Sequence, residues 1–74
     1  MKKETYPTAR TRILNALSEA GWTVKADLKQ PIAIPPDAEF KITFHAQAVY
    51  KNDHSLWIDI RGMTVQRFMY ECVR

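Results

Sequence analysis

Cysteine is nearly absent from this 74-residue chain, and long apolar runs are missing altogether. The single cysteine, Cys72, excludes an intramolecular disulfide framework and a zinc site built on paired cysteines. The longest apolar runs are only three or four residues, whereas a membrane-spanning helix needs about 20. No apolar segment follows the basic start at residues 1–4, so the sequence predicts no secretory signal and a cytoplasmic location.

The size and composition of the chain indicate one small folded domain, residues 1–74. The sequence is 46% hydrophobic and 26% charged, as is typical of a folded protein. A domain of this length buries only about 60% of the surface of its unfolded chain, which allows one thin core. We therefore expect neither a separate cofactor domain nor a cofactor.

Positive charge is in slight excess: eleven Lys and Arg face eight Asp and Glu, which gives a formal net charge of +3. The local excess lies near the N-terminus, where Lys2, Lys3, Arg10 and Arg12 outnumber Glu4. Elsewhere charges of opposite sign alternate, as on a solvated surface. Nucleic-acid binders usually gather their positive charge on one face or in one run. The charge pattern therefore permits nucleic acid as a partner without indicating it.

Two amphipathic helices are expected, one towards each end of the chain. Apolar residues recur at helical spacing over residues 8–20, with Thr8 as the N-cap and Gly21 in the left-handed conformation after the last turn. The second helix is expected to begin after Thr64, its N-cap. Its apolar stripe consists of Val65, Phe68, Met69 and Cys72. On that stripe Cys72 is expected to be a buried structural thiol.

Apolar and polar residues alternate in three segments between the helices, and each segment is expected to be a β-strand. The segments are residues 22–28, 40–48 and 56–60. Residues 30–37 hold three of the four prolines, and proline removes ladder donors, so this stretch is expected to be a loop or a frayed edge. A loop of three residues, 52–54, or one of five residues is expected to join the second and third strands, because a loop of two or four residues would turn one apolar face outward.

The order helix, strand, strand, strand, helix predicts an α+β fold of two layers, αβββα. In this fold a three-stranded antiparallel meander carries both helices on one face. The core is expected to gather Leu17, Ile42, Phe44, Ile58 and Phe68. Opposed residues share a face of a sheet, so placing Phe44 and Ile58 together pairs Lys51 with Ser55 across the loop.

Two layers leave the second face of the sheet uncovered, and this open face is the predicted binding site. By side-chain alternation it carries Trp57, Val49, His45, Gln47, Asp59, Arg61 and Lys25. In the expected register Val49 opposes Trp57. Aromatic and arginine side chains dominate binding energies at protein interfaces, so Trp57 is expected at the centre of the site. The alternative is a solvated sheet face on which Trp57 merely covers Val49.

Catalysis has a weaker basis in the sequence. His45 and Asp59 can form an acid–base pair, with Arg61 or Lys25 holding a phosphate. Such chemistry needs a pocket that restricts water, which an open three-stranded face does not provide. The sequence contains no phosphate loop, no dinucleotide fingerprint and no metal-spaced cluster of His, Cys and Asp, so no metal site is expected.

Residues 13–22, ILNALSEAGW, are similar to the helix–Gly–aromatic–strand opening of the HicA-type RNase toxins of toxin–antitoxin pairs. The helix–three strands–helix order also resembles that of double-stranded-RNA-binding domains. The toxin family carries a Gly-Ser-His catalytic element in its first strand, whereas residues 23–29 hold no histidine. The RNA-binding domains carry a Gly-Pro-x-His loop and a Lys pair at the start of the last helix, and this chain has neither. The resemblance concerns topology, and no functional residue follows from it.

The function expected from the sequence is that of a small non-catalytic binding module, of the kind found free-standing in bacteria and phages. Its partner is another protein or a second copy of the chain, held by the open face around Trp57. The alternative is an RNA- or DNA-binding domain that uses the basic N-terminal helix together with Lys25, Lys41 and Arg61. An RNase of toxin type that depends on His45 comes third. No membrane partner is expected.

Overall fold

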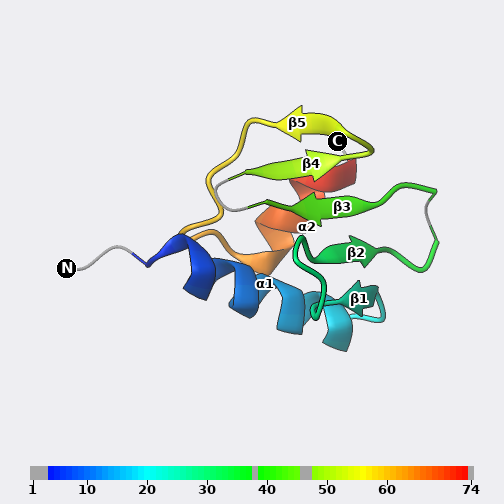
Figure 1. Cartoon of the computed structure of the whole chain (residues 1–74), viewed down its shortest axis with the longest axis horizontal. Helices are drawn as coiled ribbons and strands as arrows, with labels where there is room; N and C mark the ends of the chain where they lie inside the picture. Colours follow the sequence, from blue (N-terminus) through cyan, green and yellow to red (C-terminus); the bar gives the residue numbers. More distant parts are fainter. Residues whose placement is uncertain (1–3, 38, 46–47, 74) are drawn as a thin grey trace.

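A five-stranded antiparallel sheet and two helices make up the fold, which belongs to the α+β class (Figure 1). The computed structural model describes residues 4–37, 39–45 and 48–73. In chain order the elements are α1 (Tyr6–Glu19), β1 (Thr23–Lys25), β2 (Ile32–Ile34), β3 (Ile42–Phe44), β4 (Val49–Lys51), β5 (His54–Leu56) and α2 (Val65–Val73). The strands lie side by side in sequence order, from β1 at one edge of the sheet to β5 at the other.

Helix α1 begins earlier in the chain than the periodicity predicts. Its N-cap is Thr5, whose hydroxyl accepts the N–H of Thr8 at 3.4 Å, and Pro7 lies in the first turn. Proline is tolerated there because the first N–H groups of a helix have no partner within it. The prediction of Thr8 as the N-cap is therefore wrong. The predicted end is confirmed, since the helix stops at Glu19 and Gly21 has a left-handed φ of +97°.

Helix α2 begins where the sequence predicts. The Thr64 hydroxyl accepts the N–H of Arg67 at 3.1 Å, and the Thr64 carbonyl accepts the N–H of Phe68 at 3.0 Å, so Thr64 is the N-cap. Phe68 and Cys72 are fully buried. Burial raises the pKa of the Cys72 thiol to about 12, so the group stays protonated at neutral pH and packs as a small apolar side chain. The prediction of a buried thiol is confirmed.

The proline-rich stretch 30–37 contains a strand, which corrects the prediction of a loop or frayed edge. β2 pairs with β1 on one side and with β3 on the other, so it lies inside the sheet. Pro31 and Pro35 lie immediately outside its two ends, and the strand residues themselves all carry an N–H. Pro31 still contributes its carbonyl, which accepts the N–H of Phe44 at 2.8 Å.

The predicted long strand 40–48 holds only the short strand β3, because the chain reverses between His45 and Ala48 and β4 begins at Val49. The N–H of His45 donates to the Ala48 carbonyl at 2.8 Å, and Phe44 pairs with Val49 across the reversal. Directly opposed residues share a face of the sheet, and both Phe44 and Val49 are fully buried. The predicted position of Val49 on the open face is therefore wrong.

Strands β4 and β5 form a hairpin with a two-residue loop, Asn52 and Asp53, in place of the predicted loop 52–54. These two residues have φ values of 48° and 69°, the positive pair that a type I′ turn requires. Lys51 consequently pairs with His54 and not with Ser55. β5 ends at Leu56, and the rest of the predicted third strand lies outside the sheet. The expected αβββα layout with three strands is thus corrected to two helices and five strands.

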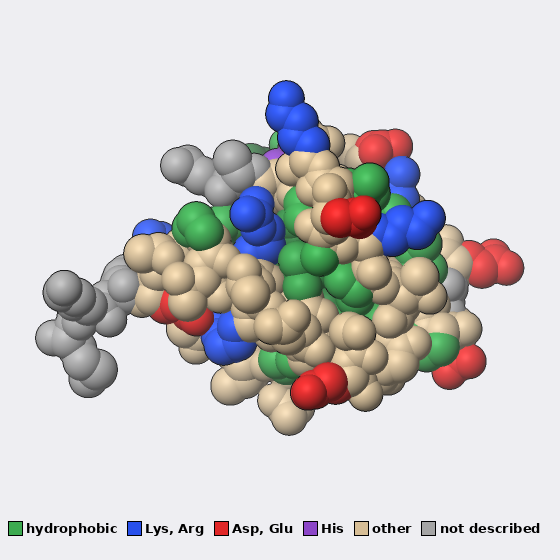
Figure 2. All heavy atoms as spheres, turned by 60° about the horizontal axis from the view of Figure 1, so that its bottom comes forward, with side chains coloured by type: hydrophobic (Ala, Val, Ile, Leu, Met, Phe, Trp, Pro, Cys, Tyr) green, Lys and Arg blue, Asp and Glu red, His purple; other side chains and the backbone are tan. Residues whose placement is uncertain are grey.

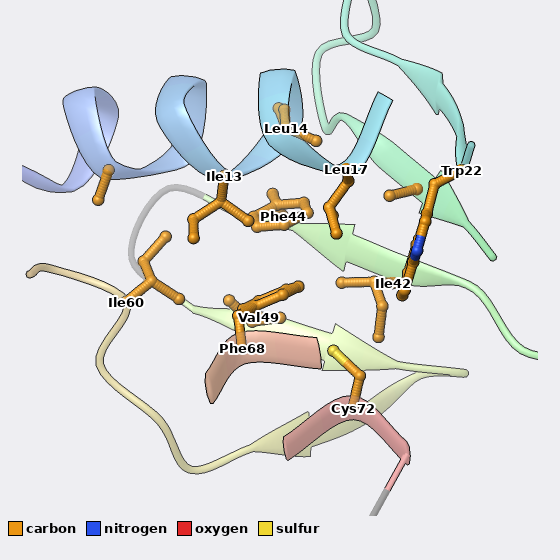
Figure 3. Packing of buried hydrophobic residues seen from close by; sticks show 12 residues of the cluster. Ile13, Leu14, Leu17, Trp22, Ile42, Phe44, Val49, Ile60, Phe68 and Cys72 are labelled. Carbon is orange, nitrogen blue, oxygen red and sulfur yellow. The ribbon is translucent and has the colours of Figure 1, made fainter. Parts of the chain in front are cut away.

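Side chains from both helices and from the sheet meet in one apolar core (Figure 3). Of the predicted core residues, Leu17, Ile42, Phe44 and Phe68 are fully buried, and Ile58 packs half-buried at the margin. The rings of Phe44 in β3 and Phe68 in α2 stack with their centroids 5.7 Å apart and their planes 19° apart. The two helices therefore cover the same face of the sheet and leave the other face open.

Candidate functional site

Trp57 is the most exposed large apolar side chain in the described part of the chain, with 94% of its surface accessible. It directly follows β5, in a segment 57–60 that leads to the turn before α2. Its neighbours Leu56 and Ile58 pack against the core margin, and Ile60 is fully buried. Side chains still alternate along this segment, so Trp57 points away from the core. The exposure predicted for Trp57 is confirmed, but its predicted position on a face of the sheet is wrong, because β5 ends at Leu56.

A hollow of about 350 Å³ opens beside Trp57. Its lining comes from the end of β5, the residue before β4 and the start of the segment 57–60. These residues, which we call the Trp57 surface, are Ala48, Ser55, Leu56, Trp57, Ile58 and Asp59. Only Asp59 among them is charged, so the surface offers shape and apolar contact more than charge.

Asp59 and Arg61 form an ion pair at the rim of the Trp57 surface. Arg61 donates from Nε to Asp59 Oδ1 at 2.9 Å and from Nη2 to Asp59 Oδ2 at 2.7 Å. These hydrogen bonds to Asp59 raise the pKa of Arg61 above its ordinary value. Both side chains are about half exposed, so the pair contributes little to stability. Its effect is to hold two opposite charges side by side, with Asp59 in the lining of the Trp57 surface.

A second hollow, of about 290 Å³, is lined by Tyr6, Ile58, Asp59 and Arg61. The Tyr6 hydroxyl is buried and has no hydrogen-bond partner within residues 4–37, 39–45 and 48–73. Burial raises the pKa of Tyr6, the positive charge of Arg10 opposes that rise, and the negative charge of Asp59 adds to it. A buried hydroxyl without a partner costs about 1–3 kcal/mol.

A polar clasp fixes the segment that carries Trp57 to the start of the chain. Arg12 of α1 donates to both carboxylate oxygens of Glu4, at 2.8 Å from Nε and from Nη2. Arg12 also donates from Nη1 to the Met63 carbonyl at 2.7 Å, while Glu4 accepts the N–H of Gly62 at 2.8 Å. The guanidinium of Arg12 and the N–H of Gly62 lower the pKa of Glu4 from 4.5 to about 2. The turn before α2 is thereby tied to α1.

In the sequence Arg12 belongs to a basic cluster near the N-terminus, and the charge pattern does not predict the clasp. Arg12 lies eight residues from Glu4 and 51 residues from Met63, so no helical i, i+4 rule connects these groups. Arg12 also donates to the Ile60 carbonyl at 3.3 Å. Most of its donors are therefore engaged inside the chain, and α1 offers less free positive charge to a ligand than its sequence indicates.

Two other predicted site residues, His45 and Lys25, do not line the Trp57 surface. His45 is half-buried, with Nδ1 3.2 Å from Gln30 Nε2 and its ring centroid 4.3 Å from that of Tyr50. These contacts give no support to the acid–base hypothesis, which needs Asp59 as the partner of His45. Lys25 is exposed on β1 and begins a row across the open face. The row, with one residue from each strand, is Lys25, Ile32, Thr43, Tyr50 and Ser55. Gln47 lies outside the described residues.

Comparison with known proteins supplies no function to carry over: no family model matches the chain, and no curated protein or solved structure matches it significantly. The five strands also depart from the three-stranded order on which the resemblance to RNase toxins and RNA-binding domains rests. The described residues contain no group of three or more His, Cys, Asp and Glu that could hold a metal ion. Neither described helix is long and apolar enough to cross a membrane.

Proposed function

We propose that this chain is a small non-catalytic binding module whose Trp57 surface holds another polypeptide. The observation that carries the proposal is the position of Trp57: its side chain is 94% exposed, although the segment around it is anchored on both sides. Ile58 packs at the core margin, Ile60 is fully buried, and the Glu4–Arg12 clasp holds the turn that follows. The indole is thus presented to solvent from a well-supported segment.

The energetic reason lies in the apolar area that Trp57 leaves in water. A tryptophan that becomes buried removes about 150–250 Å² from water, worth about 4–6 kcal/mol at 25 cal/mol per Å². This free energy is unused in the isolated chain and becomes available when a partner covers the indole. Because the segment is already held in place, little ordering entropy is lost on binding.

Nucleic acid as the partner has less support from the charges. The basic N-terminal helix predicted for this role has Arg12 engaged with Glu4 and two backbone carbonyls. Arg61, also predicted to bind nucleic acid, is paired with Asp59. Figure 2 shows Lys and Arg side chains interspersed with Asp and Glu over the face that it presents. The described residues on that face form no continuous positive stripe of the kind that follows a phosphate backbone.

The proposal is tested by comparing what the immobilised chain and its variants retain from an extract of the cells that produce it. We expect Trp57→Ala to lose the bound polypeptide while the variant stays folded, because the side chain makes few contacts with its own chain. Tyr70→Ala is the matched control, since Tyr70 is another exposed aromatic, 59% accessible, on α2. Equal retention by the parent chain and Trp57→Ala would refute the proposal.

A further inference from the structure

We infer that the polypeptide that covers the Trp57 surface is a second copy of this chain. The two copies meet through the same surface about a two-fold axis, and the indole of each Trp57 rests in the hollow beside Trp57 of the other copy. This inference rests on the proposed function, because it names the partner of the same site. The shape, the charge and the size of the surface carry it.

The shape of the Trp57 surface is complementary to itself. An interface between two identical surfaces needs a projecting group and a place that receives it within one patch. Trp57 projects with 94% of its side chain exposed, and the hollow of about 350 Å³ lies immediately beside it. This volume is at the lower end of the range of about 300–1,000 Å³ for ligand sites. Ala48 and Ser55 in its lining are small, so an indole can approach the backbone closely.

The charges of the surface also permit contact with a copy of itself. Asp59 and Arg61 lie side by side, joined at 2.7 Å. The pair carries no net charge, so two Trp57 surfaces that meet about a two-fold axis do not repel each other there. The chain carries a net charge of +3, and two copies therefore repel each other at most approaches. Two such molecules therefore repel each other least where the surface carries no net charge, as it does around Asp59 and Arg61.

The size of the surface indicates a reversible dimer. Stable interfaces bury about 1,200–2,000 Å² in total, and weak, transient ones bury less. One indole and its hollow on each copy lie at the small end of this scale. We therefore expect a dissociation constant on the order of micromolar or weaker, with Trp57 at the centre as the side chain that dominates affinity.

Sedimentation of the unmodified chain, from micromolar to millimolar concentration, gives the first measurement. We expect a monomer–dimer equilibrium whose dissociation constant rises about thirtyfold in Trp57→Ala and stays unchanged in Tyr70→Ala. Trp22→Phe leaves Trp57 as the only tryptophan and keeps an aromatic ring against Phe40. In that variant the emission of Trp57 should move to shorter wavelength, and its quenching by acrylamide should fall, as the dimer forms.

A mixture of two charge variants separates a dimer through this surface from any other self-association. Asp59→Lys leaves two positive charges, at positions 59 and 61, near each Trp57. Arg61→Glu leaves two negative charges at the same two positions. We expect each variant alone to be monomeric at concentrations where the parent chain dimerises, and the two variants together to form a heterodimer. This rescue depends on the two Trp57 surfaces meeting each other, because only then do the positive charges of one variant face the negative charges of the other, and a purely structural effect of either substitution would not produce it.

The outcomes distinguish this inference from the proposed function. A chain that stays monomeric at millimolar concentration, yet retains another polypeptide in a Trp57-dependent manner, overturns the second copy as partner and leaves the binding module standing. A dimer that Trp57→Ala does not weaken, or charge variants that fail to rescue each other, also overturns the inference. A monomer that retains nothing through Trp57 overturns both proposals.

Discussion

Replacement of Phe44 by alanine probes the centre of the core. Phe44 is fully buried, and its ring stacks on Phe68 at 5.7 Å, so the substitution removes both apolar burial and the contact that joins β3 to α2 (Figure 3). Phe→Ala substitutions in cores cost about 3–5 kcal/mol. At about 0.05–0.15 kcal/mol per residue, a chain of 74 residues has a total stability of about 4–11 kcal/mol. We therefore expect Phe44→Ala to lose at least a quarter of the stability and up to all of it.

Thermal unfolding followed by circular dichroism measures this loss. For a domain of 60–100 residues, 1 kcal/mol shifts the Tm by about 4–8 °C, so Phe44→Ala should melt at least about 12 °C below the parent chain or fail to fold. Tyr70→Ala removes an exposed aromatic and should shift the Tm by no more than a few degrees. A Phe44→Ala protein that melts within about 4 °C of the parent would refute the core packing described above.

Three further substitutions test the clasp and the β4–β5 turn. Glu4→Gln should lower the Tm at pH 7, because the pKa of Glu4 is lowered from 4.5 to about 2 in the folded chain. The stabilisation by Glu4 is present above pH 4.5 and disappears as the pH falls towards 2. The Tm values of the parent chain and Glu4→Gln should therefore converge near pH 2. A difference in Tm that does not depend on pH would contradict the clasp. Asp53→Gly should raise the Tm by a few degrees, because Asp53 has a φ of 69° and glycine adopts positive φ without strain. Asn52→Gly should gain less, since it removes the hydrogen bond from the Lys41 N–H to Asn52 Oδ1, and the reverse order would contradict the turn geometry.

The helices could be predicted from the sequence because their signals are local. Helical periodicity and a nearby cap define α2, where Thr64 accepts the N–H of Arg67 three residues later. The same holds for the end of α1, where Gly21 supplies the positive φ. Only the predicted start of α1 is wrong. Proline is accepted both in the first turn of a helix and before the helix, so Pro7 does not mark the boundary. Burial of Phe68 and Cys72 followed from the same periodicity.

The strands could be predicted only in part, because alternation does not show where a chain reverses. The segment 45–48, His-Ala-Gln-Ala, contains none of the Gly, Pro, Asn or Asp residues that mark turns. The apolar–polar alternation continues through it, so residues 40–48 resemble one strand. The reversal moves the core-facing positions from even residue numbers in β3 to odd residue numbers in β4. Val49 consequently faces the core, although the alternation of residues 40–48 predicts that it lies on the open face.

The candidate site shows the same division between local and long-range information. The sequence by itself determined that Trp57 is exposed, since its two neighbours in the chain are apolar and pack inward. Only the tertiary structure decided that Glu4 and Arg12 hold the turn at Gly62 and Met63 and that Asp59, in the lining of the hollow beside Trp57, pairs with Arg61. The contacts of Arg12 join residues up to 51 positions apart. Such contacts depend on how the sheet brings the two ends of the chain together, which no local pattern of residues records.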